Sequence, residues 1–206
     1  MYARSTTVHA DPRSVDDGIA YVRDEVMPAV HKMTGCIGLS MLCDRDDGRC
    51  IVTTAWVDEQ SMQLSTEGVR PMRDRAAEVF GSPPDVQEWE IAALHRRYET
   101  REGTWARVIW SRSDPDLADR TIDAYRMSLI PELEQMPGFC SVSLLVSRSE
   151  GRAVSATTYE SRAAIEQTRE LSVAMRDDFA TSMGVAITEV AEMELVLAHL
   201  GVPETV

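Results

Sequence analysis

Membrane-length apolar runs, lysine and phenylalanine are all scarce in this sequence of 206 residues. No apolar run approaches the roughly 18 residues that a membrane span needs. The opening residues, MYARSTTVHADPR, also lack the apolar core of a signal peptide. These absences disfavour a membrane protein, and we expect a cytoplasmic location.

Positively charged residues are also fewer than negatively charged ones. The sequence has 21 Lys and Arg residues against 34 Asp and Glu residues, which gives a net charge of −13. Phosphate backbones and anionic membranes would be repelled on average. We therefore expect no nucleic-acid partner and no membrane partner. A small molecule is the expected ligand, and the pairing of two such chains into a homodimer stays open.

Cysteine occurs only as Cys36, Cys43, Cys50 and Cys140, and no two of them form a Cys-x-x-Cys pattern. If Cys36 and Cys43 share a strand, their side chains point to opposite faces and lie roughly 20 Å apart. We interpret all four as free thiols in a reducing compartment. The sequence has no cluster of zinc ligands, no glycine-rich phosphate loop and no nucleophile elbow. We therefore expect neither a metal nor a cofactor.

What the sequence does contain is an internal repeat. Its landmarks return with a constant offset: Gly35 as Gly138, Gly48 as Gly151, and Met72-Arg73-Asp74 as Met175-Arg176-Asp177 (138 − 35 = 103, 151 − 48 = 103, 175 − 72 = 103). We interpret the chain as a tandem duplication, with one repeat in residues 1–98 and the second in residues 99–206. Each repeat is long enough for a core of its own.

Each repeat is expected to begin with a strand and a helix. The strands are expected at residues 2–9 and 103–112. An Asp-Pro pair after each strand indicates a helix start. Apolar residues at helical spacing follow, and Gly35 and Gly138 are expected to cap the helix ends. Pro28 and Pro131 lie deep inside these patterns, so we expect both helices to be kinked.

A hairpin, a second helical region and a last strand complete each repeat. The hairpin strands are expected at residues 36–43, 48–56, 139–147 and 151–159, and the last strands at residues 86–95 and 189–199. Gly68 and Pro71 interrupt the second helical region of the first repeat, residues 58–80, so we expect two pieces there. We expect the counterpart, residues 161–183, to be one unbroken helix.

The order β-α-β-β-α-β is that of the ferredoxin-like fold. Two helices cover one face of such a sheet and leave the other bare, and two repeats in one chain can pair these bare faces. The predicted fold class is α+β, with tandem ferredoxin-like repeats forming an intramolecular dimeric α/β barrel.

The hairpin regions resemble a known family. Met136-Pro-Gly138-Phe139 and Val154-Ser-Ala-Thr-Thr-Tyr159-Glu-Ser161 are similar to the antibiotic-biosynthesis-monooxygenase (ABM) domain of the dimeric α/β-barrel superfamily, and Ile51-Val-Thr-Thr-Ala-Trp56 repeats the signature. The resemblance implies a pocket between each sheet and its helices, with Trp56 and Tyr159 in the pocket walls. It also implies an oxidoreductase, since some members oxidise polycyclic aromatic substrates with O₂ and no cofactor. Others have no established catalysis.

Haem-degrading members of this family carry a His on the helix after that aromatic residue and an Asn on the first strand. Residues 61–75 and 161–178 contain no His, and the first strands contain no Asn. The resemblance therefore disfavours haem degradation.

Arg4 and Arg107 occupy equivalent positions on the predicted first strands (107 − 4 = 103). Tyr2 and Trp105 lie two residues before them, on the same strand faces. The neighbouring last strands offer the carboxylate pairs Glu88 with Glu90 and Glu192 with Glu194. An arginine facing two carboxylates is most often a structural ion-pair cluster. The alternative is an arginine aimed at an acidic or phenolate group of a ligand.

His31 lies on the flank of the first helix, and Glu134 is its counterpart in the second repeat (134 − 31 = 103). A histidine there is usually solvated, but an imidazole that faces the sheet could deprotonate a phenol. Because only the first repeat has this histidine, we expect any catalytic pocket in the first repeat.

We therefore hypothesise a cofactor-independent monooxygenase of an aromatic or polyketide-like small molecule. The catalytic residues would be His31, Trp56 and Arg4, and the substrate-binding residues would be Tyr159, Arg107, Trp105 and Tyr2. The alternative is a non-catalytic barrel that binds a small ligand or serves a structural role.

Overall fold

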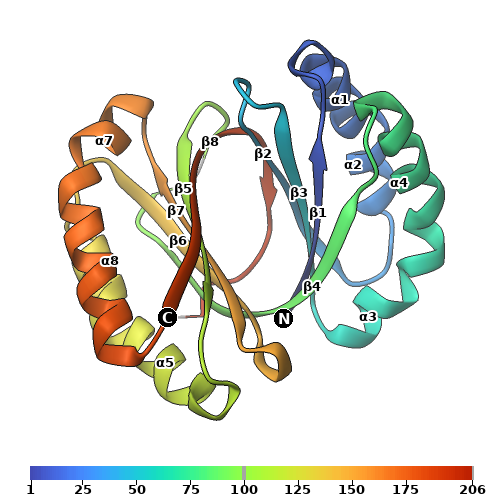
Figure 1. Cartoon of the computed structure of the whole chain (residues 1–206). Coiled ribbons are helices and arrows are strands. Elements are labelled where there is room, and N and C mark those ends of the chain that lie inside the picture. The colour runs from blue at the N-terminus through green and yellow to red at the C-terminus, as the bar shows by residue number, and fades with distance from the viewer. Residues whose placement is uncertain (99–100, 206) are drawn as a thin grey trace. The chain divides into compact units, whose positions relative to one another are not determined.

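The structure, a computed structural model, describes residues 1–98 and 101–205 (Figure 1). Its strands are β1 (Tyr2–His9), β2 (Cys36–Cys43), β3 (Arg49–Trp56), β4 (Asp85–Arg96), β5 (Trp105–Arg112), β6 (Phe139–Ser147), β7 (Arg152–Tyr159) and β8 (Ala186–Leu200). They follow one another in the closed order β1-β3-β2-β8-β5-β7-β6-β4. The α+β barrel predicted from the sequence is confirmed, because β4 neighbours β1 and the hairpins β2–β3 and β6–β7 pair as expected.

The helices repeat in the same way in both halves. The first half contains η1 (Pro12–Ser14), α1 (Val15–Tyr21), η2 (Val22–Val26), α2 (Met27–Val30), α3 (Glu59–Leu64) and α4 (Thr66–Phe80). The second half contains η3 (Pro115–Leu117), α5 (Ala118–Ala124), η4 (Tyr125–Leu129), α6 (Ile130–Leu133), η5 (Arg148–Glu150), α7 (Arg162–Gln167) and α8 (Arg169–Met183). Within the described residues, none of these helices combines the length and the apolarity that crossing a bilayer demands.

The chain forms two compact units whose limits differ from those of the sequence repeats. Unit 1 comprises residues 1–89 and 194–202, and unit 2 comprises residues 90–193 and 203–206. The reason is that β4 and β8 are long: the first part of each belongs to one unit and the second part to the other. Residues 90–96 pair with β6, and residues 194–200 pair with β2. The predicted boundary between residues 98 and 99 touches residues 99–100, which lie outside the described part of the chain.

In each unit, helices cover one face of the sheet (Figure 1). The core of unit 1 lies between its strands and the helices α1, η2 and α4, with Leu39, Met41 and Phe80 fully buried. The core of unit 2 is built in the same way around Val142 and Tyr159.

The first helix of each repeat is irregular where proline predicts it. A π-helical turn, η2 or η4, comes directly before the short helix that contains Pro28 or Pro131. Proline has no N–H to donate and its ring crowds the carbonyl one turn earlier, so a wider turn relieves the strain. These helices end at Val30 and Leu133, earlier than the predicted caps. Gly35 and Gly138 instead have positive φ in the turn before the next strand.

The second helical regions correct the sequence prediction. The first repeat does have two pieces, but the break falls at Ser65, and Pro71 lies inside α4. The counterpart is not unbroken, because it is interrupted at Thr168, the equivalent position (168 − 65 = 103). At both breaks a buried hydroxyl donates to a helical carbonyl, Ser65 to Met62 and Thr168 to Ala164 and Ile165. Such side-chain bonds compete with the helix ladder.

The four cysteines are free thiols, as expected. Cys43 and Cys50 face each other across the β2–β3 hairpin with their sulfurs 2.7 Å apart, and both are buried. The hydrogen bond that Cys43 donates to Cys50, together with burial, raises the pKa of Cys43, so this thiol stays protonated.

Gly48 provides a test of the hairpin geometry. Gly48 and Gly81 both have positive φ, +77° and +74°. A Cβ at Gly48 would lie 2.0 Å from the carbonyl oxygen of Ala10, whereas a Cβ at Gly81 would meet nothing within 4 Å. We expect Gly81→Ala to lose about 1 kcal/mol of folding free energy from its left-handed backbone. We expect Gly48→Ala to lose about 1–3 kcal/mol more from overpacking. Urea unfolding of both variants measures this difference, and equal losses would contradict it.

Candidate functional site

Unit 2 contains a cavity between its sheet and its helices. The strands β5, β6, β7 and β8 form one wall, and α5, η4, α6 and α8 form the other. Its volume is about 90 Å³. A single water needs only about 10–15 Å³, so the cavity has room for a small organic molecule. The lining residues that matter for chemistry are Arg107, Tyr125, Ser155, Thr157, Ser172 and Phe179.

Tyr125 is the most distinctive lining residue of this cavity. It lies on the π-helical turn η4, is 5% exposed, and its hydroxyl is 2.5 Å from the Ser155 hydroxyl on β7. Phe179 packs edge-on against its ring at 6.0 Å. Burial raises the pKa of Tyr125, so the phenol is a hydrogen-bonding group and not a base near neutral pH.

Arg107 enters the same cavity from β5. It is 4% exposed, its Nη2 donates to the carbonyl of Ile165 at 2.9 Å, and it forms an ion pair with Glu192 at 3.0 Å. Its guanidinium carbon lies 5.5 Å from the centre of the Tyr159 ring. The remaining nitrogen, Nη1, is buried and has no hydrogen-bond partner. A buried donor without a partner is costly, and a ligand acceptor would satisfy it.

Unit 1 has a smaller and less polar cavity in the equivalent place, about 70 Å³. Val22 and Val52 occupy the positions of Tyr125 and Ser155 (125 − 22 = 103, 155 − 52 = 103). Phe80 also fills part of this space, because Gly18 leaves room for its ring against α1. The hydroxyl pair of unit 2 therefore has no counterpart in unit 1.

Arg4, the counterpart of Arg107, has partners for its whole guanidinium. Its Nε and Nη2 donate to Glu88, and Nη2 also donates to the Met62 carbonyl and the Thr66 hydroxyl. Its Nη1 donates to the Ser65 hydroxyl at 2.8 Å. In unit 1 this arginine therefore forms an ion pair with one carboxylate, Glu88, and its catalytic role stays a prediction.

The predicted carboxylate pairs are split between different arginines. Glu90 does not face Arg4 but pairs with Arg148 in unit 2, at 2.6 Å. Glu194 does not face Arg107 but pairs with Arg45 in unit 1, at 2.9 Å. The prediction that each arginine meets two carboxylates was wrong, because β4 and β8 pass from one unit into the other between those glutamates.

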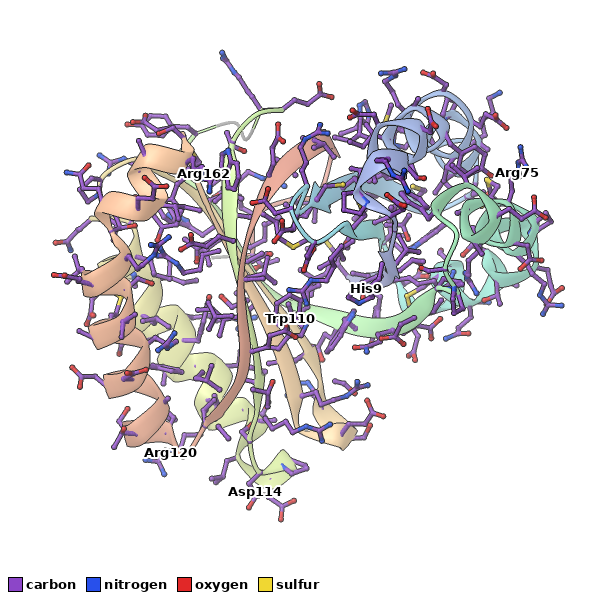
Figure 2. The ribbon with its side chains drawn as sticks, turned by 45° about the horizontal axis from the view of Figure 1, so that its top comes forward. His9, Arg75, Trp110, Asp114, Arg120 and Arg162 are labelled. Carbon is purple, nitrogen blue, oxygen red and sulfur yellow. The ribbon has the colours of Figure 1, made fainter. Side chains whose placement is uncertain are left out.

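The four aromatic residues of the predicted site are not among the described lining residues of either cavity. Trp56 is fully buried among Val30 and Met62, with Tyr2 packed beside it, and its indole N–H donates to Thr54. Tyr159 is also fully buried. Arg162, labelled in Figure 2 at the start of α7, stacks over the Trp105 ring at 5.0 Å. Of the residues selected from the sequence, Arg4 and Arg107 line the cavities, and a role for the others in binding stays a prediction.

His31 lies at the end of α2, outside the lining of the unit 1 cavity. Its ring is 4.3 Å from the ring of His199 on β8, and its Nε2 is buried without a hydrogen-bond partner. In unit 2 the equivalent pair is Glu134 and His95, 3.6 Å apart. His31, Trp56 and Arg4 therefore do not converge on one cavity, and their catalytic role stays a prediction.

Sequence reasoning missed Tyr125 and Ser155. Tyr125 falls in the apolar stripe of a helix and Ser155 falls in a strand, so neither stands out from its surroundings. The difference appears only when each is compared with the equivalent residue of the first repeat. Two valines become two hydroxyl-bearing residues at positions that face each other. A comparison of the repeats position by position could have found this pair.

The histidine pair predicts a pH effect. Burial and the nearby His199 lower the pKa of His31. Its contribution to stability is therefore present above the unfolded pKa of about 6.5 and is lost as the pH falls below that value. His31→Glu copies the other unit, where Glu134 stands at this position, and removes the imidazole whose pKa is lowered. Between about pH 8 and pH 5.5 we expect the variant to lose less stability than the unchanged protein, by about 0.5–1 kcal/mol. Urea unfolding at both pH values is the measurement, and parallel losses would refute the assignment.

The fold is shared with proteins of the ABM type. A candidate monooxygenase from Fusobacterium nucleatum superposes with a TM-score of 0.73 at 13% identity, covering 97% of this chain and 94% of that one. An anthrone oxidase-like protein gives 0.71 at 15% identity, covering 97% and 92%. A ferredoxin-fold protein related to antibiotic biosynthesis monooxygenases, from Listeria monocytogenes, gives 0.55 at 8% identity, covering 94% of each chain. The resemblance seen in the sequence is thus confirmed at the level of the fold.

Sequence comparison is more specific. No family model matches the chain. Two proteins of Mycobacterium tuberculosis strain H37Rv are similar along its entire length: Rv2557 is 48% identical over 206 residues, covering 100% of this chain and 92% of the relative, and Rv2558 is 47% identical over 207 residues, covering 100% and 88%. The chain belongs to the same family as these two mycobacterial proteins.

Proposed function

We propose that this protein is an ABM-type monooxygenase that oxidises a small aromatic molecule in the cavity of unit 2 without a bound cofactor. The observation that carries the proposal is the cavity itself. Its walls are mainly apolar, and the Tyr125–Ser155 pair and Arg107 place polar groups at separate points. A mainly apolar pocket with a few convergent polar groups is the usual form of a small-molecule site. The fold neighbours named as monooxygenase-type proteins support the reaction class.

The reaction of an electron-rich substrate with O₂ needs few catalytic groups from the protein. Anthrone, for example, loses two hydrogens from its methylene carbon and gains one oxygen atom. The second oxygen atom of O₂ leaves as water with those hydrogens, so anthrone and O₂ give anthraquinone and water. The protein need only favour the ionised substrate, exclude water and hold the developing oxyanion. Arg107 and the hydroxyl pair can supply such contacts.

A second candidate function is non-catalytic ligand binding. It is favoured by a specific observation: the described residues that line the unit 2 cavity include no carboxylate and no imidazole. A general base is therefore missing from the wall. An enzyme of this design would depend on substrates acidic enough to ionise when a positive group is near.

Oxygen consumption with anthrone as the probe separates the two functions. We expect turnover by the unchanged protein, and a decrease of about 10- to 100-fold in Tyr125→Phe, because a hydrogen bond to a charged group contributes about 1.5–3 kcal/mol. Anthraquinone formation is followed by absorbance, with circular dichroism as the check on folding.

Thr6→Val is the matched control, since Thr6 lines the unit 1 cavity and Ile109 is its counterpart in unit 2 (109 − 6 = 103). This variant should keep full turnover. Binding of anthrone without any oxygen consumption would favour the non-catalytic function instead.

A further inference from the structure

We infer that the unit 2 cavity selects aromatic molecules by an ionised oxygen, a phenolate or enolate, bound to Nη1 of Arg107. We further infer that Thr168 is the residue that leaves this nitrogen free. The inference rests on the proposed function only in using the same cavity. It concerns the ligand class and is tested by binding, without turnover.

The contacts of Arg107 leave one nitrogen of its guanidinium, Nη1, buried and without a partner. Glu192 accepts from Nε and Nη2, and the Ile165 carbonyl accepts from Nη2, so two of the three nitrogens are held by the protein. These bonds fix the side chain, which is 4% exposed, against β8 and α7. Nη1 alone is without a partner, on a residue that lines the cavity. A fixed cation with one unused donor is prepared for an acceptor on the ligand.

Arg4, the equivalent arginine in unit 1, shows which side chain can accept a hydrogen bond from Nη1. There Ser65 accepts from Nη1 of Arg4 while donating to the Met62 carbonyl. Thr168 stands at the same position in unit 2, but its hydroxyl donates to the Ala164 and Ile165 carbonyls. Both hydroxyls donate to carbonyls of the preceding turn, but of the two only Ser65 also accepts from its arginine. The two side chains differ by one methyl group.

The charges around the cavity favour an anion. Four arginines, Arg107, Arg148, Arg152 and Arg176, are among its lining residues, and no described lining residue is acidic. Arg148, Arg152 and Arg176 have carboxylate partners outside the lining, and Glu192 lies on the side of Arg107 away from Nη1. An anionic oxygen at Nη1 would therefore meet positive charge and no facing carboxylate.

The other lining residues indicate the shape and polarity of the rest of the ligand. Leu133, Leu144 and Phe179 supply apolar contact, and the Tyr125 and Ser155 hydroxyls offer one more polar point. A flat aromatic body with one ionised oxygen, and room for a second oxygen near the hydroxyl pair, satisfies each feature. In the unit 1 cavity Arg4 has partners for all its nitrogens and the hydroxyl pair is absent, although Arg73 also lines that cavity.

p-Nitrophenol is a suitable probe because its phenolate is yellow and its phenol is not. Titration of the bound probe should show an apparent pKa lower than in solution by about 1–3, the effect of one nearby opposite charge. In Arg107→Gln the apparent pKa should return to its solution value. Glu192 keeps Arg169 as a partner at 2.7 Å in this variant, so its charge is not left alone.

The exchange of Thr168 and Ser65 gives the sharper test. Thr168→Ser should allow its hydroxyl to accept from Nη1 and should weaken phenolate binding about 10-fold or more, with the fold unchanged. Ser65→Thr should do the opposite in unit 1 and add phenolate binding there. Binding of the probe with an unchanged pKa, a lowered pKa that survives Arg107→Gln, or no binding at all would each overturn the inference. Phenolate binding without oxidation of anthrone would leave the inference standing and remove the proposed function.

Discussion

The structure depends on one repeated interaction: an arginine on the first strand of each repeat that holds a broken helix and the last strand together. Arg4 binds the Met62 carbonyl and Glu88, and Arg107 binds the Ile165 carbonyl and Glu192. Each arginine is 4% exposed. The helix break frees a carbonyl that a continuous helix would use internally, and the buried guanidinium needs that acceptor. Removing one partner of such a buried pair commonly costs 3–5 kcal/mol, so both repeats have a physical reason to keep the arginine.

The same interaction explains how two similar repeats can have different cavities. The arginine, the carbonyl and the glutamate set the frame, while the residues around them differ. Valines face each other in unit 1 where Tyr125 and Ser155 meet in unit 2. Ser65 accepts a hydrogen bond from Nη1 of Arg4, whereas Nη1 of Arg107 has no such bond in the unit that carries Thr168. The bonds of each arginine to its carbonyl and its glutamate are the same in both units. Chemical divergence in this chain has therefore left the supporting contacts in place.

The fold could be predicted well because its signals are local and occur twice. Strand limits at Tyr2–His9 and Cys36–Cys43 follow from alternating patterns between turn residues, and each repeat checks the other. The helix break could not be placed, because at Ser65 a buried hydroxyl bonds the Met62 carbonyl and competes with the helix ladder, whereas Pro71 lies inside α4. Site residues were harder still. His31 was selected because an imidazole can act as a base. The structure places its ring beside His199 of β8 and outside the lining of the unit 1 cavity.

The long strands β4 and β8 have an evolutionary consequence. Each begins in one unit and finishes in the other, so each half of the sequence completes its sheet with part of a strand from the other half of the same polypeptide. When a protein of this kind is assembled from two copies of a short chain, both copies carry the same mutations and their two cavities must change together. Fusion into one gene removes that restriction. The covalent link keeps the two repeats together, so the cavity of one repeat can change its chemistry while the other repeat keeps its structural role.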